Sequence, residues 1–236
     1  MTIPEWLYFI IDPEILSRYG ERFIDGLIIT IKLVVISYTI GLCLSILIAL
    51  ARISNNRILQ YFARGYIYFF RGSPLLAQLF LFYYGVGSFS EFWQAIGLWW
   101  FFQSAWYCCL LIFALNTAAY QAEIFRGSLQ SVPSGQFEAA KALNLHRHTT
   151  FFRVILPQAM IMAIRPLGNE LILMVKASAI ASLVTVYDLM GIAKLAYSRT
   201  FDFQVYIWAA ILYLLIVEII RRFIGLTERY LTRHIF

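Results

Sequence analysis

The chain has 236 residues, of which 61% are hydrophobic, 17% are aromatic and only 14% are charged. Soluble domains carry more charge and less apolar content, so this composition excludes an ordinary soluble protein and indicates that lipid is the solvent. Most of the excess charge behind the formal net value of +6 lies in three basic groups, at 52–64, 126–153 and 221–233. Because these groups flank apolar segments, the charge is a signal of membrane topology and not of a nucleic-acid partner.

The apolar segments are long and unbroken, which predicts membrane-spanning helices and not the short alternating strands of a barrel. We therefore expect an all-α integral membrane protein with five transmembrane helices. Their expected positions are about 26–51, 59–86, 104–125, 157–186 and 205–224. Each is near the roughly 20 residues that a bilayer needs.

The three basic groups predict the side of the membrane that each end occupies. Under the positive-inside rule they place the N-terminus outside and the C-terminus inside. The expected organisation is an extracytoplasmic segment at 1–25, a transmembrane domain at 26–225 and a cytoplasmic tail at 226–236. A cytoplasmic loop at about 130–157 interrupts the transmembrane domain.

A sequence that breaks helices interrupts the second expected span. Arg71-Gly72-Ser73-Pro74 lies in its middle, and a proline removes a backbone donor and crowds the preceding turn. Two interpretations stay open: a simple kink or junction, or a discontinuous helix whose freed carbonyls line a cavity. Gln78 follows the break and either lines a pathway or bonds to another helix.

Two polar residues lie at mid-depth in the third and fourth spans. Glu170 follows Pro157 by thirteen positions, which is about 20 Å of helical rise. Asn116 lies about 15 Å from the inner end of its span. A charged residue in a span is costly and marks a functional site by default. The alternative is an internal ion pair of Glu170 with Arg165 or Lys176, but these spacings point to different faces of the helix.

A short polar helix is expected in the cytoplasmic loop, from about Gly135 to Leu143. Ser134 is the expected N-cap, and three alanines provide helix propensity with little bulk. Asn144 falls where a left-handed residue would end the helix, and Asn is the next choice after Gly. Such a helix, held outside the bilayer between two spans, is suited to contact a partner.

This loop resembles the shared cytoplasmic loop of the permease subunits of bacterial ABC importers. The family pattern is Glu-Ala-Ala, three residues, Gly, nine residues, then Ile-x-Leu-Pro. Glu138-Ala139-Ala140 matches the start, and Leu156-Pro157 matches the end at the right spacing. Asn144 stands where the family has Gly, and Val154 stands where it has Ile. The change at Asn144 affects the turn that ends the loop helix, while the change at Val154 is conservative.

Further motifs are similar to those of the polar amino acid branch of this family, and together they cover about residues 20–230. The matching segments are Arg71–Leu75, Leu115–Tyr120, Asn169-Glu170 and Lys176–Ser178. Within the branch the chain most resembles the second permease subunit of histidine, arginine, ornithine or opine importers.

The resemblance implies a fold, a location and a set of partners. We expect the fold of a type I importer permease, in multiple passes through the bacterial cytoplasmic (inner) membrane. Expected partners are a second, homologous permease subunit, two ATPases, a periplasmic solute-binding protein and the amino acid substrate. The chain has no Gly-Lys-Ser/Thr phosphate loop. We therefore expect ATP and Mg²⁺ to bind to the ATPases, and we expect no enzymatic activity and no cofactor in this chain.

Two sets of residues receive roles under this hypothesis. Asn116, Glu170 and Gln78 are the expected substrate contacts, with Glu170 facing the cationic group and Asn116 the polar backbone of an amino acid. A structural or gating role for Glu170 stays open. The expected ATPase-coupling residues are Glu138, Ala139, Ala140, Asn144, Leu156 and Pro157.

Rival classes fit the sequence less well. An ATP-independent channel or secondary transporter is the main alternative, and co-purification with an ATPase would separate the two. An intramembrane enzyme would need a nucleophile with a base, or a metal cluster, and the spans contain no such constellation. The three cysteines have no metal-ligand spacing. A structural adaptor would leave Glu170 and the loop helix unexplained.

Overall fold

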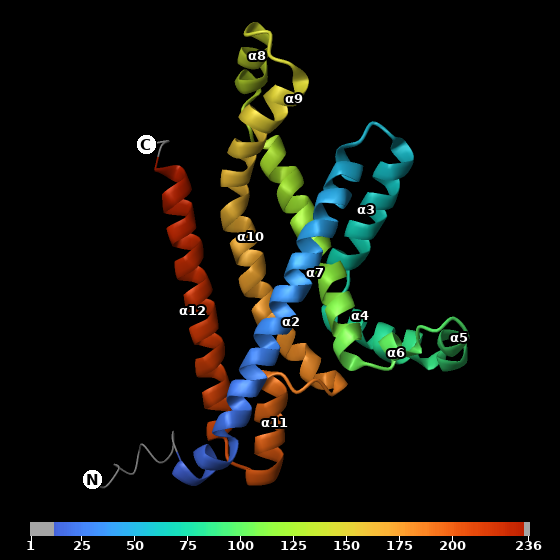
Figure 1. The fold of residues 1–236 in the computed structure, drawn as a ribbon, viewed down its shortest axis with the longest axis vertical. Helices are drawn as coiled ribbons and strands as arrows, with labels where there is room; N and C mark the ends of the chain where they lie inside the picture. The colour runs from blue at the N-terminus through green and yellow to red at the C-terminus, as the bar shows by residue number, and fades with distance from the viewer. Residues whose placement is uncertain (1–11, 234–236) are drawn as a thin grey trace. The chain divides into compact units, whose positions relative to one another are not determined.

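The computed structural model describes residues 12–233 and shows no strand among them. The first eleven residues of the expected N-terminal segment, and residues 234–236, lie outside this part of the chain. The chain forms two compact units built from interleaved segments. The helices α2 (Pro13–Ile53), α7 (Ala105–Gln130), α10 (Leu156–Ser178) and α12 (Gln204–Thr232) each contribute residues to both units (Figure 1).

Three helical segments within residues 12–233 are long and apolar enough to cross a membrane. They are Pro13–Ile53, Ala105–Gln130 and Arg147–Val184, which contain most of the first, third and fourth expected spans. The 41 residues of α2 extend about 60 Å, twice the thickness of the hydrocarbon core. Helix α12 occupies the position of the fifth expected span as one helix of 29 residues. The number of spans and the side of each terminus stay predictions.

The break expected in the second span is confirmed. Helix α3 (Arg57–Gly72) ends at Ser73, whose backbone is extended with φ −119° and ψ 148°, and α4 (Leu75–Phe80) begins after Pro74. Proline disfavours the helical conformation of the residue before it, which accounts for the position of the break. The π-helix η1 (Leu81–Gly85) and the 3₁₀-helix η2 (Val86–Ser88) follow α4.

The first unit combines residues up to 37 with residues 75–113 and 173–218. It contains the short helices α5 (Ser90–Ala95) and α6 (Trp99–Phe102), the 3₁₀-helix η4 (Ala179–Val184) and α11 (Leu189–Thr200). Its core joins α2, α11 and α12. The buried members are Tyr19, Phe23, Leu189, Ile192, Ala193, Ala196, Val205 and Ala209.

Close approach and a polar cap fix α11 against α2 in this unit. A Cβ at Gly26 would lie 2.9 Å from Ile192 and 3.1 Å from the Leu189 Cα. The Thr30 hydroxyl accepts a hydrogen bond of 3.0 Å from the Leu189 amide. Asp188 is the N-cap of α11, and its carboxylate accepts a bond of 2.8 Å from the Gly191 amide.

The second unit combines residues 38–74, 114–172 and 219 onward. Small residues let α2, α3 and α7 pack closely, with Ala49, Ile67, Ala119 and Ala122 forming one buried cluster. A second cluster joins the end of α7 to the start of α10. A Cβ at Gly168 would overlap Ile224, so a glycine is required where α10 meets α12.

Candidate functional site

Glu170 is a buried acid of the second unit. It lies on α10 and is 8% exposed. The Thr117 hydroxyl of α7 donates a hydrogen bond of 3.0 Å to its Oε1 atom. No basic side chain within residues 12–233 forms a salt bridge with it. This carboxylate has one neutral donor, and Arg71 attracts it electrostatically without forming a salt bridge. Burial of an acid without a salt bridge is costly and suits a ligand that carries a positive charge.

Polar groups of α7 and α2 continue from this acid. Gln121 lies one turn after Thr117, is fully buried, and its Nε2 atom is 3.2 Å from the Thr117 hydroxyl and 3.5 Å from the Tyr38 carbonyl. Its Oε1 atom is buried without a donor among the described residues. The Tyr38 hydroxyl donates a bond of 2.8 Å to the Leu167 carbonyl. This network ties α2, α7 and α10 together around Glu170.

The other two expected substrate contacts occupy different places. Asn116 precedes Thr117, so α7 and α10 bring it to the same level as Glu170, and its Nδ2 atom donates a bond of 3.0 Å to the Phe70 carbonyl of α3. That bond satisfies the last turn of α3 before the break. Gln78 is buried in α4, which belongs to the first unit, while Asn116 and Glu170 belong to the second.

The internal ion pairs considered for Glu170 do not form. Arg165 pairs instead with Glu228 of α12, at 2.5 Å between Nε and Oε1. Among the described residues, no salt bridge joins Lys176 to Glu170. The spacing argument from the sequence, which placed these residues on different helix faces, agrees with this arrangement.

The expected loop helix is present as α8 (Ser134–Ala142) in the second unit, between α7 and α10 (Figure 1). All its residues are exposed except Ala140, which is 3% exposed. The helix starts one residue earlier than predicted. Pro133 occupies the N-cap position with an extended ψ of 139° and no side-chain bond, so the expected capping role of Ser134 is wrong.

The turn after α8 has the geometry that the sequence predicted. Asn144 is left-handed, with φ 53°. The Leu145 amide donates to the Ala140 carbonyl at 3.0 Å, and the Asn144 amide donates to the Lys141 carbonyl at 2.9 Å. These two bonds form a Schellman motif, which satisfies the last carbonyls of the helix. Asn144 thus ends α8 in the manner expected of the family's Gly.

The loop returns to the membrane domain through α9 (Arg147–Thr149) and the π-helix η3 (Thr150–Ile155). Gln158 at the start of α10 donates a bond of 3.3 Å to Gln136 of α8. Beneath them lies the apolar cluster of Val132, Ile155 and Ala159. Leu156 is half-buried and Pro157 is exposed. Helix α8 is thus connected by packing to α10, the helix that carries Glu170.

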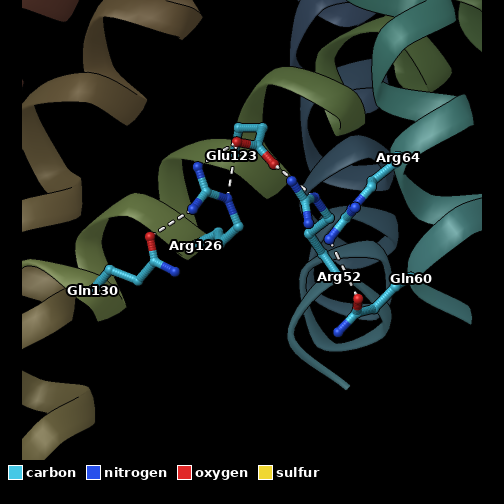
Figure 2. Close-up of polar contacts among 6 residues, drawn as sticks. All are labelled: Arg52, Gln60, Arg64, Glu123, Arg126 and Gln130. Carbon is cyan, nitrogen blue, oxygen red and sulfur yellow. Dashed lines mark hydrogen bonds and ion pairs between the residues drawn. The ribbon is translucent and has the colours of Figure 1, made fainter. Parts of the chain in front are cut away.

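A second acid, Glu123, is held by arginines near the end of α7 (Figure 2). Arg126, three residues further along the same helix, donates from Nε at 2.9 Å and from Nη2 at 2.6 Å to one carboxylate oxygen. Arg52 of α2 approaches the other oxygen at 3.5 Å. Arg126 also donates to Gln130 at 2.5 Å. Glu123 is thus held in two ion pairs, although its Oε1 atom accepts no hydrogen bond among the described residues.

Sequence reasoning missed Thr117, Gln121 and Tyr38. The first two lie four residues apart in an apolar helix, which places them on one face, and that pattern was the available signal. Tyr38 had no such signal, because its role depends on the approach of α2. Gly41 permits that approach, since a Cβ there would overlap the Thr117 methyl group.

An all-helical membrane domain with a buried acid and an exposed loop helix has the features of a transport permease. Residues 41–233 match the family described as the binding-protein-dependent transport system inner membrane component. This match covers more than half of the chain, which therefore belongs to that family. The family consists of transport components of the inner membrane, not of enzymes.

Individual relatives indicate which kind of transport permease this chain resembles. The chain is 38% identical to the nopaline transport system permease protein NocM of Agrobacterium fabrum, over 94% of this chain and 93% of that protein. It is 36% identical to the histidine/lysine/arginine/ornithine transport system permease protein HisM of Escherichia coli, over 94% and 97% of the two chains. A crystal structure of an amino acid ABC transporter with histidines matches with a TM-score of 0.81 and 34% identity, over 98% of this chain and all of that one.

These matches confirm the resemblance found in the motifs. The protein is an ABC importer permease of the polar amino acid and opine type, located in the inner membrane with several apolar helices. Its fold is that of the type I importer permeases.

Proposed function

We propose that this chain forms half of the translocation pathway of an ATP-driven importer for basic amino acids or opines. A second, homologous permease completes the pathway, two ATPases supply the energy, and a periplasmic solute-binding protein delivers the substrate. The names of the relatives support the substrate class: NocM is named for nopaline and HisM for histidine, lysine, arginine and ornithine. The buried, unpaired Glu170 carboxylate is the single observation that carries the proposal to residues of this chain.

Glu170 receives the cationic group of the substrate in this proposal. A buried carboxylate that is bonded only to a hydroxyl gains most from a ligand that is both cationic and a hydrogen-bond donor. Asn116 contacts the polar backbone of the amino acid. The donor-free Gln121 Oε1, one turn along α7, offers a further acceptor.

Uptake by the assembled importer tests this role. Glu170→Gln keeps the size and the bond with Thr117 but removes the charge, so uptake of a basic amino acid should fall by about tenfold or more, the size of one charged hydrogen bond. Glu228→Gln is the matched control, because it removes an acid from the same unit at a surface ion pair. Uptake at the wild-type level by Glu170→Gln, with unchanged substrate preference, would reject the contact.

A double-mutant cycle separates a substrate contact from a purely structural role. Thr117→Val removes the donor to Glu170 while keeping its shape. If the pair acts together on substrate, the effects on uptake should be less than additive and larger than the loss of thermal stability that each variant shows. Additive losses that follow stability would show that the two residues only hold the helices.

Helix α8 is the proposed contact for the ATPases. Its exposed face carries Glu138 and Ala139, its small residues permit deep seating in a groove, and it packs through η3 onto α10. Nucleotide binding to the ATPases favours one of two states of the permease pair, and the movement of α8 transmits that preference to the substrate site. Asn144, Leu156 and Pro157 hold α8 in position on the loop.

Charge reversal on α8 tests the coupling. Glu138→Lys should leave insertion and expression intact but separate ATP hydrolysis from uptake in reconstituted vesicles. Glu91→Lys, an equal change of charge on the exposed start of α5, is the control. Normal coupled uptake by Glu138→Lys would remove α8 from the mechanism.

The family membership supports an ATP-driven importer over an ATP-independent channel or secondary transporter. Affinity purification of the tagged full-length chain from its native membrane decides between them. The importer predicts that an ATPase subunit co-purifies in stoichiometric amount, and transport by this chain alone in vesicles without ATP would favour the alternative.

A further inference from the structure

A cationic cavity opens on α2, α3 and α7 in the second unit, and Glu170 is not among the residues that line it. Its volume is about 560 Å³. The charged residues that line it are Arg52, Arg64, Arg71 and Glu123. Tyr68 and Tyr120 form its aromatic walls. The size is within the range of sites that bind small ligands or headgroups.

The charges of this cavity do not balance. Its one carboxylate, Glu123, is engaged by Arg126 and Arg52. Arg64 bonds only to the neutral Gln60 at 3.3 Å, and Arg71 lies over the Tyr120 ring at 5.1 Å from its centroid (Figure 2 shows the Arg52 and Arg64 ends of this group). Neither forms a salt bridge with an acid of residues 12–233. Arg71 is attracted electrostatically by Glu123 and by Glu170. Three guanidinium groups around a space lined by one carboxylate still leave a net positive charge, which favours an additional anion.

Helix α3 presents these charges in a regular stripe. Basic and aromatic residues alternate at spacings of four and three, which places them on one helix face: Arg57, Tyr61, Arg64, Tyr68 and Arg71. Tyr61 is 77% exposed and Tyr68 is 83% exposed. Exposed aromatic rings beside arginines are typical of the boundary between hydrocarbon and headgroups, and not of a surface in bulk water.

Arg52 and Arg64 line the part of the cavity that lies toward the connection between α2 and α3. Ala49 of α2 and Ile67 of α3 belong to one buried cluster, and the short 54–56 connection makes these helices antiparallel. Arg52 lies three residues after Ala49 on α2, and Arg64 lies three residues before Ile67 on α3. Both arginines are therefore nearer to the connection than the buried contact is. Arg52 is in the last turn of α2. The connection between α2 and α3 is expected at the membrane surface, so both guanidinium groups can extend toward the phosphates of the bilayer with their stems along the apolar helices.

We propose that this cavity binds the phosphate of an anionic phospholipid headgroup. Guanidinium groups bind phosphate oxygens with paired, charge-assisted hydrogen bonds, and Arg52 and Arg64 supply two forks at the mouth. Tyr68 packs on the glycerol and the first methylenes of the lipid. Bound lipid fixes α3 against α2, next to the turn of α3 that Asn116 holds. The site is independent of which amino acid is transported.

Native mass spectrometry of the full-length protein in mild detergent tests this proposal. The protein is incubated with phosphatidylglycerol or with phosphatidylcholine of the same acyl chains, and retained lipids are counted. Wild type should retain phosphatidylglycerol preferentially, and Arg64→Gln should weaken its retention about fivefold, since one basic residue at an anionic surface contributes about 1 kcal/mol. Arg52→Gln/Arg64→Gln should abolish the preference. Arg57→Gln is the matched control, because it lies on the same helix and stripe but does not line the cavity.

A competition arm separates the lipid from soluble phosphate. Inorganic phosphate at millimolar concentration should leave the retained phosphatidylglycerol in place, because the acyl chains add affinity. Displacement by inorganic phosphate, with no preference between the two lipids, would show that the cavity takes a free phosphate and would overturn the lipid assignment. Equal retention of both lipids, or a loss in Arg57→Gln as large as in Arg64→Gln, would overturn it as well.

Wild-type protein and a conservative variant decide the question if the glutamine variants do not fold. Its thermal stability should be higher in nanodiscs of phosphatidylglycerol than of phosphatidylcholine, and Arg64→Lys, which keeps the charge but loses the fork, should retain an intermediate preference. Equal stability of the wild type in both lipids would count against the proposal.

Discussion

Gly41 has no side chain, and this lets α2 approach α7 closely enough for the candidate site to form. A Cβ there would overlap the Thr117 methyl group and lie 3.1 Å from the Ala114 carbonyl. The close approach of α2 to α7 brings the Tyr38 carbonyl to Gln121 and leaves Thr117 directed at Glu170. The packing of two helices therefore sets the donor of the buried acid.

Gly41→Val should destabilise the protein by roughly 1–3 kcal/mol, the usual cost of forcing a larger group into a packed contact. The measurement is thermal unfolding in detergent, together with uptake by the assembled importer. Gly65→Ala is the control, because a Cβ at Gly65 meets nothing within 4 Å and alanine favours the helix. If both variants unfold at the wild-type temperature, the close approach of α2 to α7 is not required.

Asp188 is a buried acid outside the expected spans. It is fully buried and caps α11, and the Tyr213 hydroxyl donates to its second oxygen at 3.3 Å. Burial raises the pKa of Asp188 from 3.8 to about 6, against the opposing hydrogen bonds from Gly191 and Tyr213. Because the folded state holds the proton more tightly than the unfolded chain, this group favours folding most below pH 3.8, and the contribution is lost as pH rises to about 6.

Asp188→Asn should therefore flatten the pH dependence of stability between pH 3.8 and about 6. Asparagine keeps the cap and cannot ionise. Above that pH window the free energy of unfolding of the variant should therefore increase relative to that of the wild type, by at most about 3 kcal/mol. Thermal unfolding in detergent at the two ends of the window provides the measurement. Parallel curves for the two proteins would show that the carboxylate does not titrate there.

At the scale of elements, α8 depends on the turn that ends it. The Schellman motif at Asn144 fixes the direction in which the chain leaves the helix, and the bond between Gln158 and Gln136 holds the helix over α10. A residue with φ 53° carries a steric cost unless it is Gly or Asn. Asn144 therefore adopts the left-handed conformation at the position where the family pattern has glycine.

Asn144→Gly should preserve the stability of α8 and its exchange protection, whereas Asn144→Val should cost about 1–2 kcal/mol, because a branched side chain is strained in the left-handed region. Hydrogen exchange of the α8 amides reports this locally. Asn55→Val, in the short loop before α3 and away from the candidate site, is the control. Equal exchange rates in Asn144→Val and wild type would contradict the role of the turn.

At the scale of the whole molecule, the proposed topology places α8 and the end of α12 on the cytoplasmic side. Single cysteines at Gln136 and Thr232, with the exposed Cys43 changed to Ser, should react with an impermeant maleimide in inverted vesicles and not in intact spheroplasts. A cysteine at Glu91 should show the reverse. Labelling of Gln136→Cys from outside would invert the topology and remove α8 from contact with any ATPase.

Much of the architecture followed from local properties of the sequence. Apolar runs predicted the long helices, because unpaired backbone is too costly in lipid, and Pro74 predicted the break after α3. Alanine content and Asn144 predicted α8 and its end, since both effects act within a few residues. The motif matches identified the family before any contact between helices was known.

The tertiary structure decided which polar groups meet. The pairing of Glu170 with Thr117, the choice of Glu228 as the partner of Arg165, and the cavity of Arg52, Arg64 and Arg71 all join residues from different helices. Such contacts depend on how closely two helices approach and how each is rotated about its axis. Glycines such as Gly41 and Gly168 permit the close approach because they have no side chain. Hydrophobic pattern and propensity act along one helix, so they determine where helices form, while packing determines which side chains they bring together.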